Sequence, residues 1–216
     1  MVAKQLENIL RRAVRDRGAV RVTLDANDEY VHGFPVALSR EFVLMREVSD
    51  LRLDGYYVIP LWNIKAVRAG KFERSLGHIA QRERWLDKLT PPRGVDIDSE
   101  MSLLRGLQQL ARPIIIETVG LVMKNEPGEP VMLIGPIVKV GEEAVWIHNF
   151  DATGKWDRRP KKVLFNDIAT VQFAMNYINV WRRNLQPPTP PAPAPGRRST
   201  TSPPRAKPAR RRRKRR

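Results

Sequence analysis

The sequence predicts a mainly β protein with helices, an α+β fold of two tandem units that each hold one helix and five short strands. A segmental similarity is the first observation behind this prediction. Residues 53–67 and 151–171 share an order of features: Asp and Gly before an aromatic residue, an apolar run, Asn, Ile and Val. Gly33 and Gly135 also interrupt comparable strand-like segments. A change of composition at Gln186 marks a disordered tail.

The first unit, residues 1–70, begins with an amphipathic helix. Apolar residues recur at helical spacing from about residue 4 to residue 17, and Gly18 is well placed to end the helix. Arginines occupy the opposite side, where a solvated face is the favoured interpretation and contact with nucleic acid the alternative. The Asp54-Gly55 pair predicts a hairpin turn. Alternation of apolar and polar residues predicts strands at residues 19–24, 30–38, 42–48, 56–61 and 64–68.

A linker, residues 71–98, is predicted to hold a helix and a Pro/Gly-rich boundary, at residues 72–89 and 90–94. The second unit, residues 99–185, repeats the plan of the first. Its helix is expected at about residues 100–111, with Asp98 or Ser99 as the N-cap. Its strands and a last amphipathic piece are expected at residues 113–119, 131–140, 144–150, 163–165, 168–173 and 177–181.

Charge is distributed unevenly along the chain. The net charge is +16, but eleven of the 39 Lys and Arg residues and no acidic residue lie in residues 186–216, the disordered tail. The remainder holds 28 basic and 23 acidic residues, a net charge of +5. The chain contains no cysteine and no run of eighteen apolar residues, so we expect a soluble protein without a transmembrane segment, located in the cytoplasm.

The order of a short helix and five bent strands resembles the Sm-like barrel and, more loosely, SH3-like small β-barrels. The glycine in the second strand, the Phe-Val-Leu-Met of residues 42–45 and the closing Ile-x-x-Val carry the resemblance. It covers two copies, at about residues 4–68 and 100–180, as in uncharacterised bacterial proteins with tandem barrels of this kind. The resemblance implies a fold of two tandem small barrels.

The residues that bind RNA in Sm-like proteins are missing here. The family commonly places Asp and Asn near the start of the third strand, and an Ile-Arg-Gly or Tyr-Lys-His element before the last. This chain has Ser39-Arg40-Glu41 at the first place, and residues 59–61 and 164–166 at the second. The resemblance therefore supports a fold rather than the family's RNA pocket.

No constellation of residues predicts an enzyme, a metal or a cofactor. The three histidines, His32, His78 and His148, are far apart in sequence and have no cysteine beside them. Asp151 and Asp157 flank Gly154-Lys155-Trp156 and could form an acid–base pair, but a hairpin turn is the favoured interpretation. Glycine-rich phosphate loops and a nucleophile elbow are also lacking.

Residues 1–185, which precede the tail, are called the body. Its best candidate for an interaction surface is a basic stretch around one tryptophan. Phosphate contacts and base stacking need this combination of cations and an aromatic ring. An exposed hairpin loop whose tryptophan packs back on the barrel is nevertheless the favoured interpretation of this stretch. The predicted nucleic-acid-binding residues of this stretch are Lys155, Trp156, Arg158, Arg159, Lys161 and Lys162.

The tail combines a Pro-rich spacer with clusters of cations. Nine of the eighteen prolines lie in it, and such a segment cannot build a core. Its clustered cations predict salt-dependent binding to any polyanion without sequence preference, and a tail without a selected role is the alternative. The predicted binding residues of the tail are Arg197, Arg198, Arg210, Arg211, Arg212, Arg213, Lys214, Arg215 and Arg216.

Two hypotheses follow from the sequence. The first is a non-enzymatic, nucleic-acid-associated protein that binds RNA or DNA through the cationic tail, with RNA favoured. The second is a protein-interaction or scaffold module that binds a protein partner through exposed barrel edges. Sm-like proteins usually form rings by edge-strand pairing, so the resemblance leaves a pseudo-dimer and half of a larger ring equally open.

Overall fold

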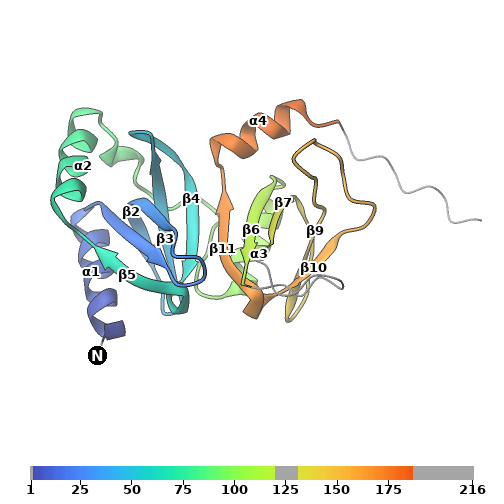
Figure 1. Ribbon diagram of the computed structural model, residues 1–216, viewed down its shortest axis with the longest axis horizontal. Helices are drawn as coiled ribbons and strands as arrows, with labels where there is room; N and C mark the ends of the chain where they lie inside the picture. Colours follow the sequence, from blue (N-terminus) through green and yellow to red (C-terminus); the bar gives the residue numbers. More distant parts are fainter. Residues whose placement is uncertain (1, 120–130, 187–216) are drawn as a thin grey trace, which may run out of the picture.

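The protein has a mixed α+β fold, as predicted, in two halves that share one order of elements (Figure 1). The computed structural model describes residues 2–119 and 131–186. The first half comprises α1 (Val2–Asp16), β1 (Val20–Leu24), β2 (Tyr30–Leu38), β3 (Phe42–Ser49), β4 (Arg52–Pro60), the 3-10 turn η1 (Leu61–Asn63) and β5 (Ile64–Arg68). The linker holds α2 (Lys71–Arg82) and the 3-10 turn η2 (Leu86–Lys88).

The second half comprises α3 (Glu100–Gln109), β6 (Ile114–Thr118), β7 (Met132–Gly135), β8 (Ile137–Val140), β9 (Ala144–Ile147), β10 (Lys161–Leu164), the 3-10 turn η3 (Phe165–Asp167), β11 (Ile168–Phe173) and α4 (Asn176–Asn184). None of the helices in the described ranges is both long and apolar enough to cross a membrane.

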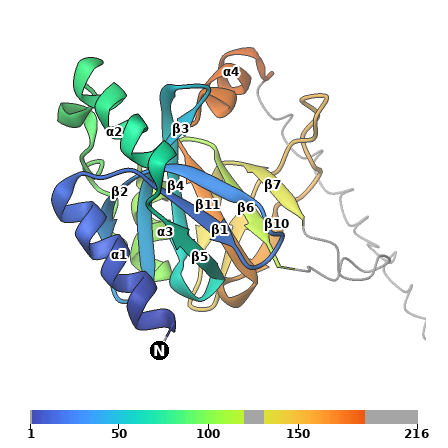
Figure 2. The ribbon, with the colours of Figure 1, turned by 60° about the vertical axis from the view of Figure 1, so that its left-hand side comes forward.

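The strands of the first half are antiparallel and lie in the order β5-β1-β2-β3-β4. Side chains alternate between the two faces of these strands, so one face becomes apolar. Leu10 and Ala13 of α1 close that face and are buried with Val20, Val22 and other strand residues. α1 and α2 both lie at the end of the molecule away from the second half (Figure 1 and Figure 2).

The second half repeats this pairing order with one interruption. β11 pairs with β6 and β6 with β7, whereas β8, β9 and β10 form a separate three-stranded sheet. The single strand predicted at 131–140 is thus divided at Pro136, because proline supplies no N–H to a ladder. Leu103, Leu104 and Leu107 of α3 cover the apolar interior, as α1 does in the first half.

The two halves are joined by an antiparallel pairing of β4 with β11, in which Val58 lies opposite Val171. This pairing produces one eight-stranded sheet, in the order β5-β1-β2-β3-β4-β11-β6-β7. The expectation of two separate small barrels needs correction here, because a sheet of eight strands is not a small barrel. The seam includes Asn63, which is fully buried and donates a hydrogen bond from Nδ2 to the Ala169 carbonyl at 2.9 Å.

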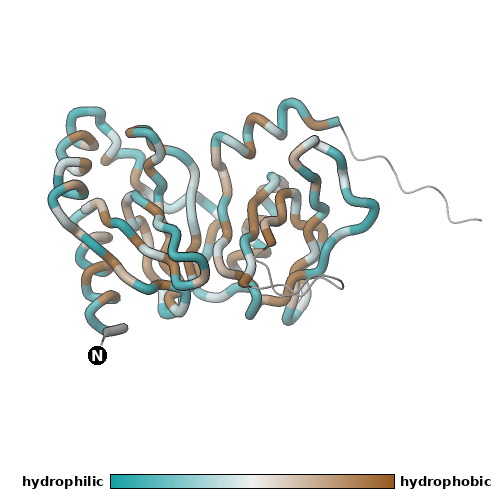
Figure 3. Tube along the Cα trace, in the orientation of Figure 1, coloured by the Kyte–Doolittle hydropathy of each residue, from teal (hydrophilic) through white to brown (hydrophobic). Residues whose placement is uncertain are grey.

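The shared sheet has an apolar core on each of its faces. Val58 and Val171 are buried with α3 and the interior of the second half, whereas Ile59 faces the core of the first half with Leu10. Burial of such a side chain stabilises the fold by about 1.5–3 kcal/mol. Figure 3 shows the resulting alternation of hydrophobic and hydrophilic residues along the strands.

Gly33 and Gly135 occupy the same place in the two halves. A Cβ atom on Gly33 would overlap the carbonyl oxygen of Arg46 on β3, and one on Gly135 would overlap that of His148 on the segment after β9. Both positions require the absence of a side chain, because the neighbouring strand's backbone approaches too closely. Gly33 and Gly135 therefore meet the same steric requirement.

Several predicted boundaries move. The β3–β4 turn lies at Asp50 and Leu51, which adopt φ of 47° and 54°, rather than at Asp54-Gly55. Asp54 and Gly55 lie inside β4, where Asp54 Oδ1 accepts the Asn176 N–H at 2.6 Å. The predicted helix 72–89 ends at Arg82 and is followed by η2, and the strand expected at 163–165 is β10.

Candidate nucleic-acid interface

The loop between β9 and β10 carries most of the predicted binding residues of the body and is mainly hydrophilic (Figure 3). Asp151 organises it: Asp151 Oδ1 accepts hydrogen bonds from the N–H and hydroxyl of Thr153 and from the Lys155 N–H. These bonds, the Thr153 hydroxyl first among them, lower the pKa of Asp151. Gly154 has φ of +80°, so Asp151 and Gly154 serve the turn, as the favoured interpretation expected.

Trp156 packs back against the body. Its ring centroid lies 5.0 Å from that of His148 and 5.3 Å from that of Phe150, and its indole N–H donates to the Gln186 carbonyl at 2.8 Å. The side chain is half-buried, and its one donor is already satisfied. Trp156 therefore has the geometry of the interpretation favoured from sequence, a loop tryptophan that folds back onto the body of the protein.

The cations of the loop divide into two groups. Lys155, Arg158, Arg159 and Lys162 are exposed, whereas Lys161 is half-buried with Nζ 3.8 Å from Asp157 Oδ2. The exposed cations remain able to contact phosphate groups.

An aromatic side chain that the sequence interpretation missed lies beside these cations. Trp146 on β9 is directly opposite Lys162 on β10 and Lys139 on β8. Lys139 Nζ lies 4.8 Å and Lys162 Nζ 5.9 Å from the centre of the Trp146 ring. These three residues form a row across the outer face of the small sheet, which we call the Lys-Trp-Lys row.

Strand alternation explains why the row faces outward. Val145 and Ile147 are buried in the core of the second half, so Trp146 between them points away from it. The sequence shows the same alternation at residues 145–147. The binding site was predicted at Trp156 instead, because five basic residues surround that tryptophan. Lys139 lies outside that stretch and reaches Trp146 only through the pairing of β8 with β9.

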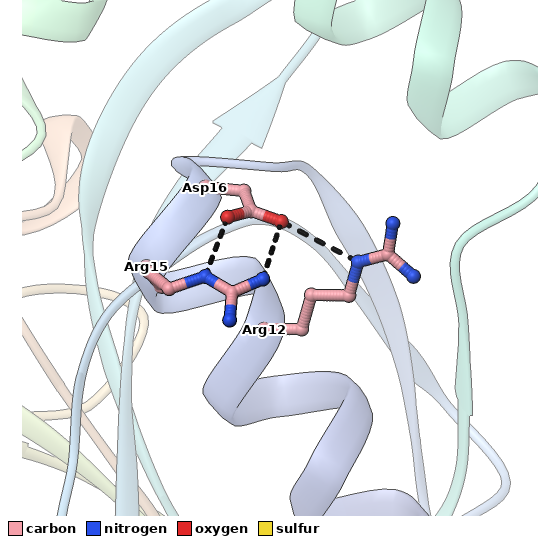
Figure 4. A network of polar contacts seen from close by, with 3 residues as sticks. All are labelled: Arg12, Arg15 and Asp16. Atoms are coloured by element: carbon pink, nitrogen blue, oxygen red, sulfur yellow. Dashed lines mark hydrogen bonds and ion pairs between the residues drawn. The ribbon is translucent and has the colours of Figure 1, made fainter.

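The basic face of α1 has been considered as a second contact surface. Arg15 Nε donates to Asp16 Oδ1 at 2.8 Å, and Arg12 Nε lies 3.4 Å from Asp16 Oδ2 (Figure 4). Asp16 raises the pKa of Arg15, first through their hydrogen bond. Asp16 thus neutralises part of the positive charge on the exposed face of α1.

Two carboxyl groups near the β4–β11 seam, Glu47 and Glu117, have raised pKa values. Burial raises the pKa of Glu47 to about 7, with smaller contributions from Asp54 and Glu117. Burial also raises the pKa of Glu117, although hydrogen bonds from Thr170 Oγ1 and Gln172 Nε2, at 2.7 and 2.9 Å, act in the opposite direction. Glu47 Oε2 has no hydrogen-bond partner in the described part of the chain.

The three histidines lie on β2, α2 and just after β9. Across residues 2–119 and 131–186, no three His, Asp or Glu side chains converge as metal ligands would.

The predicted binding residues of the tail, Arg197 to Arg216, lie outside the described residues. No protein-family model, no curated protein and no solved structure matches this chain.

Proposed function

We propose that the protein is a non-enzymatic nucleic-acid-binding protein, located in the cytoplasm, whose main ligand is RNA. The single observation that supports this proposal is the Lys-Trp-Lys row, Lys139, Trp146 and Lys162. An outward aromatic ring offers a stacking surface for any base, and a base on such a ring contributes about 1–3 kcal/mol. The ammonium groups of Lys139 and Lys162 lie over the half-buried ring, so in the proposal a stacked base displaces them toward the phosphates on either side of it.

The loop extends this surface with further positive charge. Arg158 and Arg159 are exposed and follow the half-buried Trp156 in the same loop. In the proposal, Trp156 holds the loop against the body, while the arginines contact the nucleic-acid backbone. Glu142 and Glu143, at the β8–β9 turn, limit the cationic surface on one side.

The tail contributes a separate, sequence-independent contact in the proposal. Its eleven cations without an acid bind a polyanion by counterion release, which is steeply salt-dependent. The row then provides the preference for single strands, because bases in a duplex do not expose their faces.

We also propose that the body derives from two fused small barrels of the Sm-like kind. The strand orders β5-β1-β2-β3-β4 and β11-β6-β7 with β8-β9-β10 support this, as do Gly33 and Gly135. The β4–β11 pairing would then be the junction that turned two barrels into one body.

A scaffold function is the second candidate. β5 and β10 each end a sheet, so their outer edges are available for pairing with a strand of another protein.

Binding of fluorescently labelled single-stranded RNA and duplex DNA at two salt concentrations tests the proposed function. The proteins compared are the full chain, a chain ending at Leu185, and Trp146→Ala in both lengths. We expect the shortened chain to retain a preference for single-stranded RNA. Trp146→Ala should lower its affinity about 5- to 100-fold, because a stacked base is lost.

Lys139→Gln with Lys162→Gln should reduce the slope of log affinity against log salt by about 1.4, since two phosphate contacts are lost. Lys88→Gln, at an exposed lysine of η2, is the matched control and should change neither quantity. If the chain ending at Leu185 binds no nucleic acid, the tail is the only anchor and the scaffold function is favoured.

A further inference from the structure

The outer face of β1, β2 and β5 in the first half carries a line of aromatic rings. The ring centroid of His32 lies 5.0 Å from that of Tyr30 and 5.1 Å from that of Phe72. Tyr30 and His32 belong to β2, and Phe72 to the first turn of α2. Tyr30 is 60% exposed and Phe72 48% exposed, so two large rings at the ends of the line face solvent.

Two arginines flank these rings. The guanidinium carbon of Arg21 lies 5.3 Å from the centre of the Tyr30 ring. Arg21 on β1 is paired with His32 on β2 and with Arg68 on β5, so the two arginines are cross-strand neighbours. Tyr30, His32, Phe72, Arg21 and Arg68 together are called the aromatic-arginine face below.

Glu73 is the carboxylate beside this face, and it already accepts a hydrogen bond from within the protein. Glu73 is 3% exposed, and its Oε2 accepts the Gly70 N–H at 2.5 Å at the start of α2. Arg68 Nε lies 3.9 Å from the same oxygen, and the Arg68 side chain is 57% exposed. Arg68 can therefore contact an anion in solvent without leaving Glu73.

Two nitrogen atoms on the face are unsatisfied. Arg21 Nε and His32 Nε2 are buried and have no hydrogen-bond partner among the described residues. Buried polar atoms without a partner are uncommon in folded proteins, and a ligand is one physical reason for them. Burial, followed by the charges of Arg21 and Arg68, lowers the pKa of His32 against the opposing effect of Glu73. The lowered pKa favours the neutral imidazole, which stacks as an aromatic ring between Tyr30 and Phe72.

We propose that the aromatic-arginine face is a second binding site, specific for single-stranded nucleic acid. Bases stack on the exposed rings of Tyr30 and Phe72, and the backbone phosphates contact Arg21 and Arg68. Exposed rings beside positive charge match the alternating bases and phosphates of a single strand. The site lies in the other half of the protein from the Lys-Trp-Lys row, and it does not depend on that row.

An oligonucleotide with and without bases tests this assignment. The probes are a labelled oligouridine and an abasic oligomer of the same length and charge. Their binding to the full chain and its variants is measured by fluorescence anisotropy at several salt concentrations. We expect Tyr30→Ala with Phe72→Ala to weaken binding of the oligouridine about 30-fold or more, because two stacked bases are lost, while leaving the abasic oligomer and the salt slope unchanged.

Substitution of an arginine on this face should affect binding differently from substitution of the aromatic rings. Arg68→Gln should weaken binding of both oligomers and reduce the magnitude of the salt slope by about 0.7, one phosphate contact of a single strand. Tyr177→Ala on α4 is the matched control, because this tyrosine is 48% exposed and lies in the other half. It should bind both oligomers as the unmodified chain does.

Equal binding of oligouridine by the Tyr30/Phe72 variant and the unmodified chain would overturn the proposal, provided thermal unfolding shows both proteins folded. If Trp146→Ala alone removes the preference for bases, the Lys-Trp-Lys row is the stacking site and the aromatic-arginine face is not. If the Tyr30/Phe72 variant loses the preference and Trp146→Ala retains it, this inference stands and the role of the row is refuted. A loss in both variants supports two sites.

Discussion

The outer faces of the two halves have the same backbone pairing and opposite chemistry. In the first half, Arg21 is paired with His32 and Arg68. In the second, the same pairing places Ile115 beside Ile134 and Gln172. The cations and the histidine of one half are thus replaced by two isoleucines and an amide in the other.

The helix that follows each half explains the difference. α4 covers the second face, where Ile178 is buried against Ile115 and Ile134. α2 covers only part of the first face, where Leu76 and Ala80 pack near Phe34, while Phe72 at its start stays exposed. Side chains on a covered face are apolar or, like Gln172, hydrogen-bonded, whereas a face left open can carry charge. Strand pairing therefore sets where a side chain lies, and the covering helix decides its chemistry.

The largest expected effect tests the backbone plan that the halves share. Gly33→Ala and Gly135→Ala should each lower the free energy of unfolding by about 3 kcal/mol, because the added Cβ overlaps a backbone carbonyl. Urea unfolding measures both. Gly77→Ala in α2 is the control: no atom lies within 4 Å of its added Cβ, so helix propensity should raise stability by about 0.5–1 kcal/mol. A large loss at only one of the two glycines would break the correspondence.

A matched pair of substitutions tests the contrast between the faces. Ile134→Ala should lower the free energy of unfolding by about 3 kcal/mol, because a buried side chain in the α4 contact is lost. His32→Ala, at the corresponding position, should cost about 1 kcal/mol or less, because its Nε2 has no hydrogen bond to lose. Chemical denaturation compares them directly. Equal costs would show that the first face is as much a structural core as the second.

The smallest effect concerns Glu47, whose position in the second half is taken by Asn149. The folded-state pKa of Glu47 is raised to about 7, so the native state holds a proton that the unfolded state loses above pH 4.5. Stability should therefore fall as the pH rises from 4.5 to 7, by about 1 kcal/mol after allowance for solvent screening. Thermal unfolding across this range should show that Glu47→Gln removes this part of the pH dependence. An unchanged profile in the variant would assign it to another group.

Local patterns predicted most of the elements, because they depend on neighbouring residues. The helices and most strands lie close to their predicted ranges, and Gly33 and Gly135 were recognised as a pair. The Asp54-Gly55 turn was wrong because Met175 and Asn176, far along the chain, hold that dipeptide inside β4.

The features that the sequence did not predict depend on contacts between distant segments. Pairing of β4 with β11 cannot be inferred from the alternation of either strand, because alternation gives faces and not partners. Trp146 was identifiable as outward-facing, but its lysine neighbours come from two other strands. Phe72 lies beside His32 only because α2 packs beside β2. Nothing in the local sequence of either residue carries that contact.

The β4–β11 pairing also sets an order of events during synthesis on the ribosome. The outer edge of β4 stays unpaired until β11 is synthesised, because the partner of Val58 is Val171, more than one hundred residues later in the chain. At ordinary translation rates this interval is roughly ten seconds. Throughout it, the first half exposes an apolar strand edge of the kind that recruits other chains. Slow synthesis of the second half should therefore increase aggregation of nascent chains, and the protein's yield depends on the timing of its own translation.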